Sequence, residues 1–243
     1  MKTDKKFIDE DLKSYLNCNN CLELGVFNGS ELGLYSHLIK KHVRNLTSID
    51  ISNQALQLAE KYFKEKNIDG IKLIQMNACD LKFDDNMFDV VVTASFHEMD
   101  PSIQFKILEE ANRVLKKHKK IIFIEPHEDS VTNELFKVFD PNENHAQRIL
   151  NTKSCIRKFA KKYGYNINEL VKSISLNQFD SKEQLLNEML NWWSDIRVPQ
   201  NENEEKQMKT EIQNTLQKFA EKDFINNQVN EIIWCWILEK KEN

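Results

Sequence analysis

The residues most suggestive of chemistry in this chain are its glycines, because they are few and clustered. The sequence has five glycines in 243 residues, where average usage of ~7% would give about 17. Three of them, Gly25, Gly29 and Gly33, follow one apolar run closely. A backbone that turns tightly against a ligand leaves no room for a Cβ, which is why glycine is used there. The cluster therefore predicts a ligand-binding turn between a strand and a helix.

Two acidic residues flank this turn and indicate the charge of the ligand. Glu23 lies two residues before Gly25, at the carboxyl end of the expected strand, and Asp50 ends the next run along the chain. A carboxylate at the end of a buried strand is costly unless it answers a positive charge. Phosphates would be repelled there, and the chain has neither a G-x-G-x-x-G fingerprint nor a Gly-Lys-Ser/Thr P-loop at this turn. The pattern favours a cationic ligand such as S-adenosylmethionine over NAD or ATP.

The turn belongs to an alternation of short apolar runs with helical stripes, which predicts parallel strands joined by helices. In such sheets nucleotides bind at the carboxyl ends of the strands, where Gly25 is expected to lie. Apolar residues at helical spacing predict helices over 54–66 and 107–117. The expected strands are 21–24, 46–49, 71–74, 88–93 and 121–124.

After residue 153 the pattern becomes mainly helical. The fold class expected is α/β, a doubly wound, mostly parallel seven-stranded sheet with a helical cap inserted before the last strand. We expect a core at 1–180, a cap at 181–228, and the final strand and tail at 229–243. The elements expected in this part are a helix over 155–163 stopped by Gly164, a strand over 174–179, helices over 182–193 and 204–222, and a strand over 231–240.

Composition limits the possible partners. A net charge of -4 argues against a nucleic-acid binder with a broad basic surface. The longest apolar stretch, 232–238, is too short to span a bilayer, and the first residues show no apolar signal core. We therefore expect a cytoplasmic monomer or homodimer without a membrane partner. Cys18 and Cys21 form a C-x-x-C that lacks a second pair, so we expect free thiols and no metal.

At the motifs themselves, the sequence resembles the class I S-adenosylmethionine-dependent methyltransferases. The segment Leu22-Glu-Leu-Gly-Val-Phe-Asn-Gly is similar to their first motif, E/D-x-G-x-G-x-G, with Phe27 in place of the middle glycine. The resemblance implies that Glu23, Gly25, Phe27 and Gly29 line the cofactor. It also implies that Asp50 holds the ribose hydroxyls, which a carboxylate can accept, and that Ile51 packs on the adenine.

Two further stretches carry the resemblance, which spans roughly residues 15–170. The segment 76–91 is similar to the family's "GDAxxLPFxDxSFDxV", with Asn77 in place of the Asp that meets the adenine amino group and Ala78 beside it. The segment 109–126 is similar to "E-x-x-RVLKPGG" and the strand after it. Together the motifs imply a Rossmann-like methyltransferase fold with S-adenosylmethionine as its cofactor, and Ser95 is expected to line it.

Methyl transfer is a displacement at an activated carbon, so the protein mainly aligns the acceptor and excludes water. Groups for this task should follow the strands 88–93 and 121–124. His97 is the best candidate for a base or an acceptor-orienting group, with Glu98 next. Alternatively, His97 is a scaffold or cofactor-contacting residue, as in family members with His at this place.

Candidates for binding the acceptor come later in the chain. His127 follows the strand 121–124, and His145 and Arg148 share a face if their segment is helical. An Arg in a chain that mostly uses Lys hints at an acidic acceptor, although a surface ion pair explains it as well. Trp192 either lines the acceptor pocket or packs the cap onto the body.

The expected function is methyl transfer to the O, N or C atom of a small molecule, an acidic one included. One alternative is a related S-adenosylmethionine-using transferase with altered chemistry. Another is a non-catalytic, methyltransferase-like interaction protein, which the departures at Phe27 and Asn77 keep open.

Overall fold

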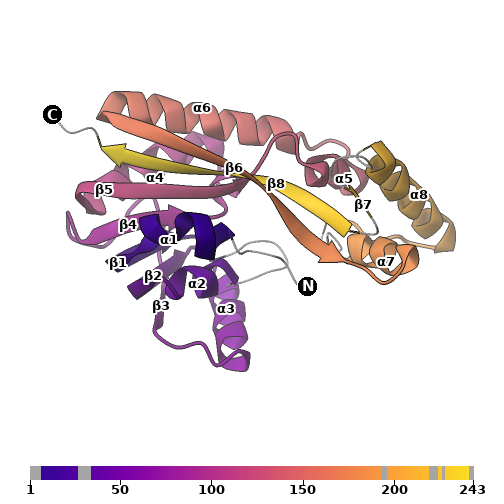
Figure 1. Ribbon diagram of the computed structural model, residues 1–243, viewed down its shortest axis with the longest axis horizontal. Helices are drawn as coiled ribbons and strands as arrows, with labels where there is room; N and C mark the ends of the chain where they lie inside the picture. Colours follow the sequence, from indigo (N-terminus) through magenta and orange to yellow (C-terminus); the bar gives the residue numbers. More distant parts are fainter. Residues whose placement is uncertain (1–6, 27–33, 193–195, 219–223, 226–227, 241–243) are drawn as a thin grey trace. The chain divides into compact units, whose positions relative to one another are not determined.

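A computed structural model of the chain describes residues 7–26, 34–192, 196–218, 224–225 and 228–240 (Figure 1). The strands are β1 (Cys18–Leu24), β2 (Val43–Asp50), β3 (Ile71–Gln75), β4 (Phe88–Thr93), β5 (Leu115–Pro126), β6 (Tyr165–Gln178), β7 (Phe224–Ile225) and β8 (Gln228–Lys240). The helices are η1 (Ile8–Leu12), α1 (Lys13–Leu16), α2 (Leu34–Lys40), α3 (Asn53–Glu65), η2 (Phe96–Glu98), α4 (Pro101–Val114), α5 (Val131–Phe139), α6 (His145–Tyr163), α7 (Lys182–Trp192) and α8 (Glu202–Lys218).

The strands form one sheet, with the order β3-β2-β1-β4-β5-β8-β6 along its main path and β7 beside β8. The pairs β1–β2, β1–β4, β2–β3 and β4–β5 are all parallel. The order reverses between β1 and β4, so this is a doubly wound sheet, and the predicted fold class is confirmed. The two-residue strand β7 was not predicted.

The burial of the central strands follows from their mainly apolar sequences. All six residues of β4 are buried, as is the second half of β1, because helices cover both faces of a parallel sheet. Glu23 of β1 is in register with Ser48 of β2 on one side and Val92 of β4 on the other. The carboxyl ends of these three strands therefore meet, and the segments that follow them can share a site.

The chain forms two compact units. The sheet unit contains Lys6–Glu125, Asn151–Leu170 and Trp234–Asn243, and the helical unit contains Pro126–Leu150 and Val171–Ile233. Two of the boundaries fall within β6 and β8. The domain division at residues 180 and 228 stays a prediction.

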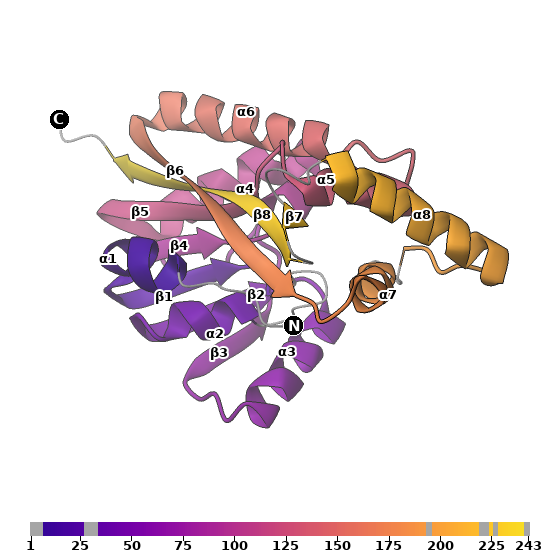
Figure 2. The same ribbon diagram turned by 45° about the vertical axis from the view of Figure 1, so that its right-hand side comes forward.

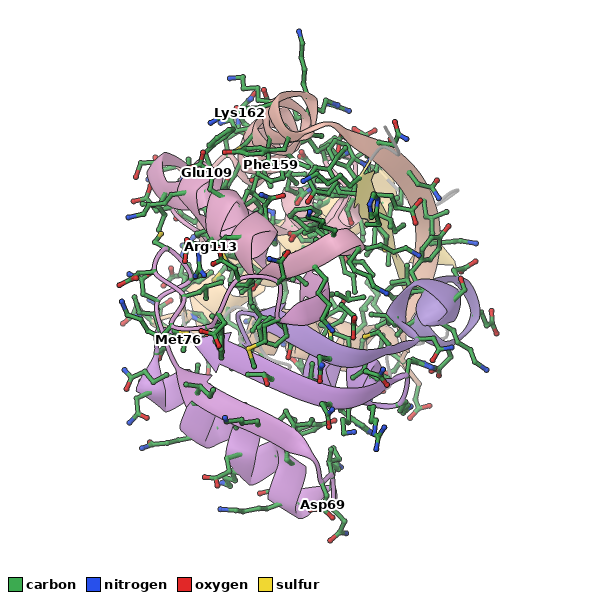
Figure 3. All side chains as sticks on the ribbon, turned by 90° about the vertical axis from the view of Figure 1, so that its left-hand side faces the viewer. Asp69, Met76, Glu109, Arg113, Phe159 and Lys162 are labelled. Carbon is green, nitrogen blue, oxygen red and sulfur yellow. The ribbon has the colours of Figure 1, made fainter. Side chains whose placement is uncertain are left out.

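Within the sheet unit, α4 and the end of α6 lie next to each other (Figure 3). Lys162 Nζ and Tyr163 Oη both donate to the carboxylate of Glu109 on α4, at 3.0 and 2.7 Å. On the same helix, Arg113 donates to the carbonyl oxygens of Leu81 and Phe83 at 2.8 and 2.9 Å. Arg113 thereby fixes the loop between β3 and β4, which contains the motif resembling the adenine-binding stretch.

The helical unit is built from α5, α7 and α8 (Figure 2). Met208, Ile212 and Leu216 recur at helical spacing along α8 and are buried. Lys209 of α8 pairs with Glu183 of α7 at 2.9 Å. No helix among the described residues is both long and apolar enough to cross a membrane.

Candidate active site

The turn after β1 requires its first glycine for two reasons. Gly25 has φ +82°, a conformation that side-chain-bearing residues rarely adopt. A Cβ added to it would lie 2.8 Å from Ser95 Oγ in the segment after β4. Gly25 also donates its N–H to Ile49 O at 2.8 Å, which ties the turn to the end of β2. Phe27, Gly29 and Gly33 lie outside the described residues.

Asp50 is held at the mouth of this turn by backbone donors. Its Oδ2 accepts from Val26 N at 3.1 Å and its Oδ1 from Ser52 N at 2.8 Å. Each carboxylate oxygen can accept a second hydrogen bond, so the group retains capacity for two ligand hydroxyls. The neighbouring Ile51 side chain is 69% exposed, which leaves an apolar surface beside the carboxylate. This arrangement suits a ribose with an adjoining flat ring.

Glu23 is buried, and its Oε2 accepts from Ser36 Oγ at 2.6 Å and from Ser48 Oγ at 2.5 Å. Burial raises the pKa of Glu23 to about 7, against the two serine hydrogen bonds, which lower it. The nearby Asp50 raises this pKa further. From the sequence, we expected a positive charge to offset the cost of burying this carboxylate. In the structure, two serine hydroxyl groups that donate hydrogen bonds to it also reduce that cost.

Asn77 forms a turn of its own beside Asp50. Its Oδ1 accepts from Cys79 N at 2.9 Å, and its carbonyl oxygen accepts from Asp80 N at 3.0 Å. Met76 N donates to Asp50 O at 3.0 Å, so this turn and the expected ribose-binding carboxylate are adjacent. The exposed Asn77 amide oxygen has one lone pair beyond the turn bond.

The segment after β4 is fixed by a residue that the sequence analysis did not select. Glu125 is the penultimate residue of β5, is fully buried, and accepts from Phe96 N at 2.7 Å and His97 N at 3.4 Å. It also forms a very short hydrogen bond with His97 Nδ1. On the other side of the ring, His97 Nε2 lies 2.9 Å from Glu98 Oε1. Glu125 could have been identified from the sequence, because its carboxylate directly follows the apolar run 121–124.

This environment sets the charge of His97. Burial lowers its pKa, but the negative charges and hydrogen bonds of Glu125 and Glu98 together outweigh burial and raise the pKa to about 10. His97 is therefore an imidazolium at neutral pH, with both nitrogens protonated. In that state it donates hydrogen bonds and holds Glu98, whose side chain is 45% exposed.

The acceptor-binding candidates of the helical unit are joined through Asn133, which is buried. Its Nδ2 donates to His127 O at 2.7 Å and Glu128 O at 2.9 Å, and its Oδ1 lies 2.6 Å from His145 Nδ1. His145 is stacked on Phe136, with ring centroids 5.2 Å apart.

Two other candidates stand apart from this arrangement. Arg148, which lies with His145 in the first turn of α6, pairs with Glu143 at 2.8 Å, as the ion-pair alternative expected. The backbone of Trp192 ends α7, and its side chain lies outside the described residues.

Comparison with known proteins shows which family a part of the chain resembles. Residues 22–118, which contain the glycine turn, Asp50, Asn77 and His97, match a family described as a methyltransferase domain. Over this segment the chain is similar to methyltransferase domains. S-adenosylmethionine is the cofactor of this family, and the Asp50 carboxylate with the exposed Ile51 fits its adenosyl group.

Named relatives resemble only part of this chain. A phosphatidylethanolamine N-methyltransferase from Cereibacter sphaeroides is 33% identical over 104 residues, 42% of this chain and 48% of the relative. A demethylmenaquinone methyltransferase from Geobacillus sp. (strain WCH70) is 35% identical over 77 residues, 32% of each. The matches thus span less than half of either relative. A solved putative methyltransferase from Bacillus halodurans C-125 has a TM-score of 0.60 at 15% identity, covers 96% of each chain and shows the shared fold.

Proposed function

We propose that this protein binds S-adenosylmethionine and transfers its methyl group to an O, N or C atom of a small molecule. The observation that carries the proposal is the arrangement around Asp50. A carboxylate fixed by two backbone donors lies beside an exposed apolar residue, next to a turn whose backbone conformation favours glycine. These features follow adjacent strands where the sheet order reverses, which is where such folds bind nucleotides.

Each residue proposed to hold the cofactor is assigned to the part of the cofactor that its side chain suits. Asp50 accepts the ribose hydroxyls, and Ile51 covers the adenine. Glu23 supplies negative charge toward the cationic amino-acid end. The remaining residues shape the turn or face the ring: Gly25, Phe27, Gly29, Asn77, Ala78 and Ser95. When bound, the cofactor supplies a methyl group that its sulfonium already activates, so alignment of the acceptor and exclusion of water remain for the protein.

His97 and Glu98 are proposed to orient the acceptor. Because Glu125 and Glu98 keep His97 protonated at neutral pH, the orienting role is better supported than the role of a base. His127, His145, Arg148 and Trp192 are proposed to bind the acceptor. The Arg148–Glu143 pair leaves an acidic acceptor with less support than the sequence suggested.

Calorimetry with S-adenosylmethionine and S-adenosylhomocysteine tests the proposal. Hydrogen bonds to a charged group contribute roughly 1.5–3 kcal/mol each, so Asp50→Ala should weaken binding of both compounds about 100-fold or more. The exposed Asp69 provides a matched control, and Asp69→Ala should leave the affinity unchanged. No binding of either compound by the unmodified protein would contradict the proposal.

Turnover then separates methyl transfer from the alternatives. Formation of S-adenosylhomocysteine together with a methylated small molecule supports the proposal. Transfer of another group of the cofactor would indicate altered chemistry. Binding without any turnover would support the non-catalytic interaction protein.

A further inference from the structure

Two serine hydroxyl groups donate to the same oxygen of the Glu23 carboxyl group. Ser36 of α2 and Ser48 of β2 both donate to Oε2, at 2.6 and 2.5 Å. All three side chains are buried within the sheet unit. A carboxylate oxygen has two lone pairs, and these two donors use both lone pairs of Oε2. When Glu23 is protonated, its hydrogen is therefore carried by Oε1.

The surroundings of Glu23 oppose its ionisation. The carboxyl group is buried, and the negative charge of Asp50 at the end of the adjacent strand β2 adds to the cost. The serine hydroxyl groups favour the ionised form, but the pKa of Glu23 is still raised to about 7. The groups that face Glu23 in the described part of the chain include no cation: the Asp50 carboxylate and the Ser48 hydroxyl from β2, the Cys21 thiol from β1, the Ser36 hydroxyl from α2 and the apolar Val92 from β4.

The cofactor proposed for this site brings a positive charge. Both S-adenosylmethionine and S-adenosylhomocysteine carry an ammonium group at the amino-acid end, toward which Glu23 is proposed to supply negative charge. Glu23 lies at the carboxyl end of β1, two residues before Gly25. An opposite charge within about 4–6 Å favours the ionised form of a carboxyl group. Binding of the amino-acid end beside this turn therefore favours loss of the Glu23 proton.

We propose that Ser36 and Ser48 are positioning residues that confine the Glu23 proton to Oε1, and that the ammonium group of the cofactor replaces this proton when it binds. This inference rests on the proposed function. The O–H bond of Oε1 breaks, its electron pair stays on the carboxylate, and the proton passes to the solvent. Both serine hydroxyl groups donate to Oε2 before and after this step, so the carboxylate keeps its position. Cofactor binding is thus coupled to the release of a proton.

Titration calorimetry in two buffers counts the released protons, because the buffer that takes up each proton adds its own heat of ionisation. At pH 6.5 a group with a pKa of about 7 is roughly three-quarters protonated. Binding of S-adenosylhomocysteine in phosphate and in imidazole buffer should therefore show release of about that fraction of a proton. 5′-Methylthioadenosine has no ammonium group and should release none. Equal binding enthalpies of S-adenosylhomocysteine in the two buffers would overturn the inference.

The Glu23→Gln variant assigns the released proton. Its amide has no proton to lose in this pH range, so binding of S-adenosylhomocysteine should release none. In the unmodified protein, Kd should rise about tenfold for each pH unit below pH 6, and in the variant it should change less than twofold between pH 6 and pH 5. Glu60, an exposed residue of α3, provides a matched control, and Glu60→Gln should behave as the unmodified protein. Undiminished proton release by Glu23→Gln would overturn the assignment. If this variant does not fold, the comparison with 5′-methylthioadenosine still decides whether the ammonium group displaces a proton.

Substitution of Ser36 tests the positioning role. Ser36→Ala removes a donor that favours the ionised form, so the pKa of Glu23 should rise and more protons should be released at pH 7.5 than by the unmodified protein. Ser36→Thr keeps the hydroxyl group and should restore the unmodified value. Ser154, an exposed serine of α6, provides the control, and Ser154→Ala should leave the proton release unchanged.

The possible outcomes separate this inference from the proposed function. Equal proton release by Ser36→Ala and the unmodified protein would overturn the positioning role, because a purely structural contact would leave this count unchanged. Circular dichroism establishes that the variants fold, and Ser48→Ala replaces Ser36→Ala if the latter does not. Binding of S-adenosylhomocysteine without proton release would overturn this inference alone. Failure of the unmodified protein to bind S-adenosylhomocysteine would contradict the proposed function itself.

Discussion

The buried pair of His97 and Glu125 gives the sharpest stability prediction. Glu125→Gln keeps an acceptor for Phe96 N but removes the negative charge that faces the imidazolium. Both side chains are buried, and breaking a buried ion pair by removing one partner costs ~3–5 kcal/mol. We therefore expect the free energy of unfolding to fall by about that amount at pH 6.

The pH dependence of this loss identifies its cause. The pKa of His97 is raised to about 10 in the folded protein, against about 6.5 in an unfolded chain. The stability from this shift is fully present below pH 6.5 and is lost as the pH rises through 10. In that window the folded state holds one more proton, so this group lowers stability by ~1.4 kcal/mol per pH unit. The difference between the unmodified protein and Glu125→Gln should therefore shrink steadily from pH 6.5 toward pH 10.

Urea denaturation at several pH values measures this difference. The carboxylate of Glu109, which pairs with Lys162 on the surface of the same unit, provides the control. Because exposed pairs contribute ~1 kcal/mol or less, Glu109→Gln should cost little at any of these pH values. A loss below 1 kcal/mol for Glu125→Gln, or one that stays constant with pH, would refute the reasoning.

Two further predictions concern the cofactor turn. Gly25→Ala should lower stability by ~1–3 kcal/mol, because a side chain at φ +82° is strained, and should weaken cofactor binding as well; an unchanged melting temperature would contradict this. The pKa of Glu23 is raised to about 7, so the stability linked to its protonated form is present below its ordinary pKa and is lost as the pH rises through 7. The Glu23→Gln variant has no such loss, so it should gain stability relative to the unmodified protein between pH 5 and pH 8. Urea titrations without cofactor at these two pH values measure the difference in the free energy of unfolding between the two proteins. If this difference is the same at both pH values, the assignment is wrong.

The fold was predictable where local sequence and final environment agree. The mainly apolar run of β4 predicted its bounds, Phe88–Thr93, because a strand that is buried on both faces has little choice of residues. The helix expected over 54–66 corresponds to α3. The helix expected over 107–117 overlaps α4, which begins six residues earlier, after the capping residue Asp100, and ends at Val114. The strand β5 was predicted from residue 121, although it begins at Leu115.

The start of β5 was missed because its charges are neutralised by distant residues. Lys116 pairs with Asp89 of β4, and Lys120 pairs with Glu239 of β8, each at 3.1 Å. From the sequence alone these partners are unknown, and a run of charged residues such as 116–120 then indicates a loop.

The site was predictable to the level of motif residues and not of partners. Asp50 and Ile51 were found from the resemblance, and their surroundings suit the predicted role. His97 was selected, but its charge depends on Glu125, 28 residues away, and sequence gives no pKa. Asn133 was not selected at all, because an asparagine in a helix has no sequence signal for the amide contacts that it makes.

A crystal structure of the protein with S-adenosylhomocysteine tests the central claim most directly. The account predicts that both ribose hydroxyls donate to the Asp50 carboxylate and that the adenine lies on Ile51. An adenosyl group bound elsewhere, with Asp50 making no contact to the ribose, would contradict it.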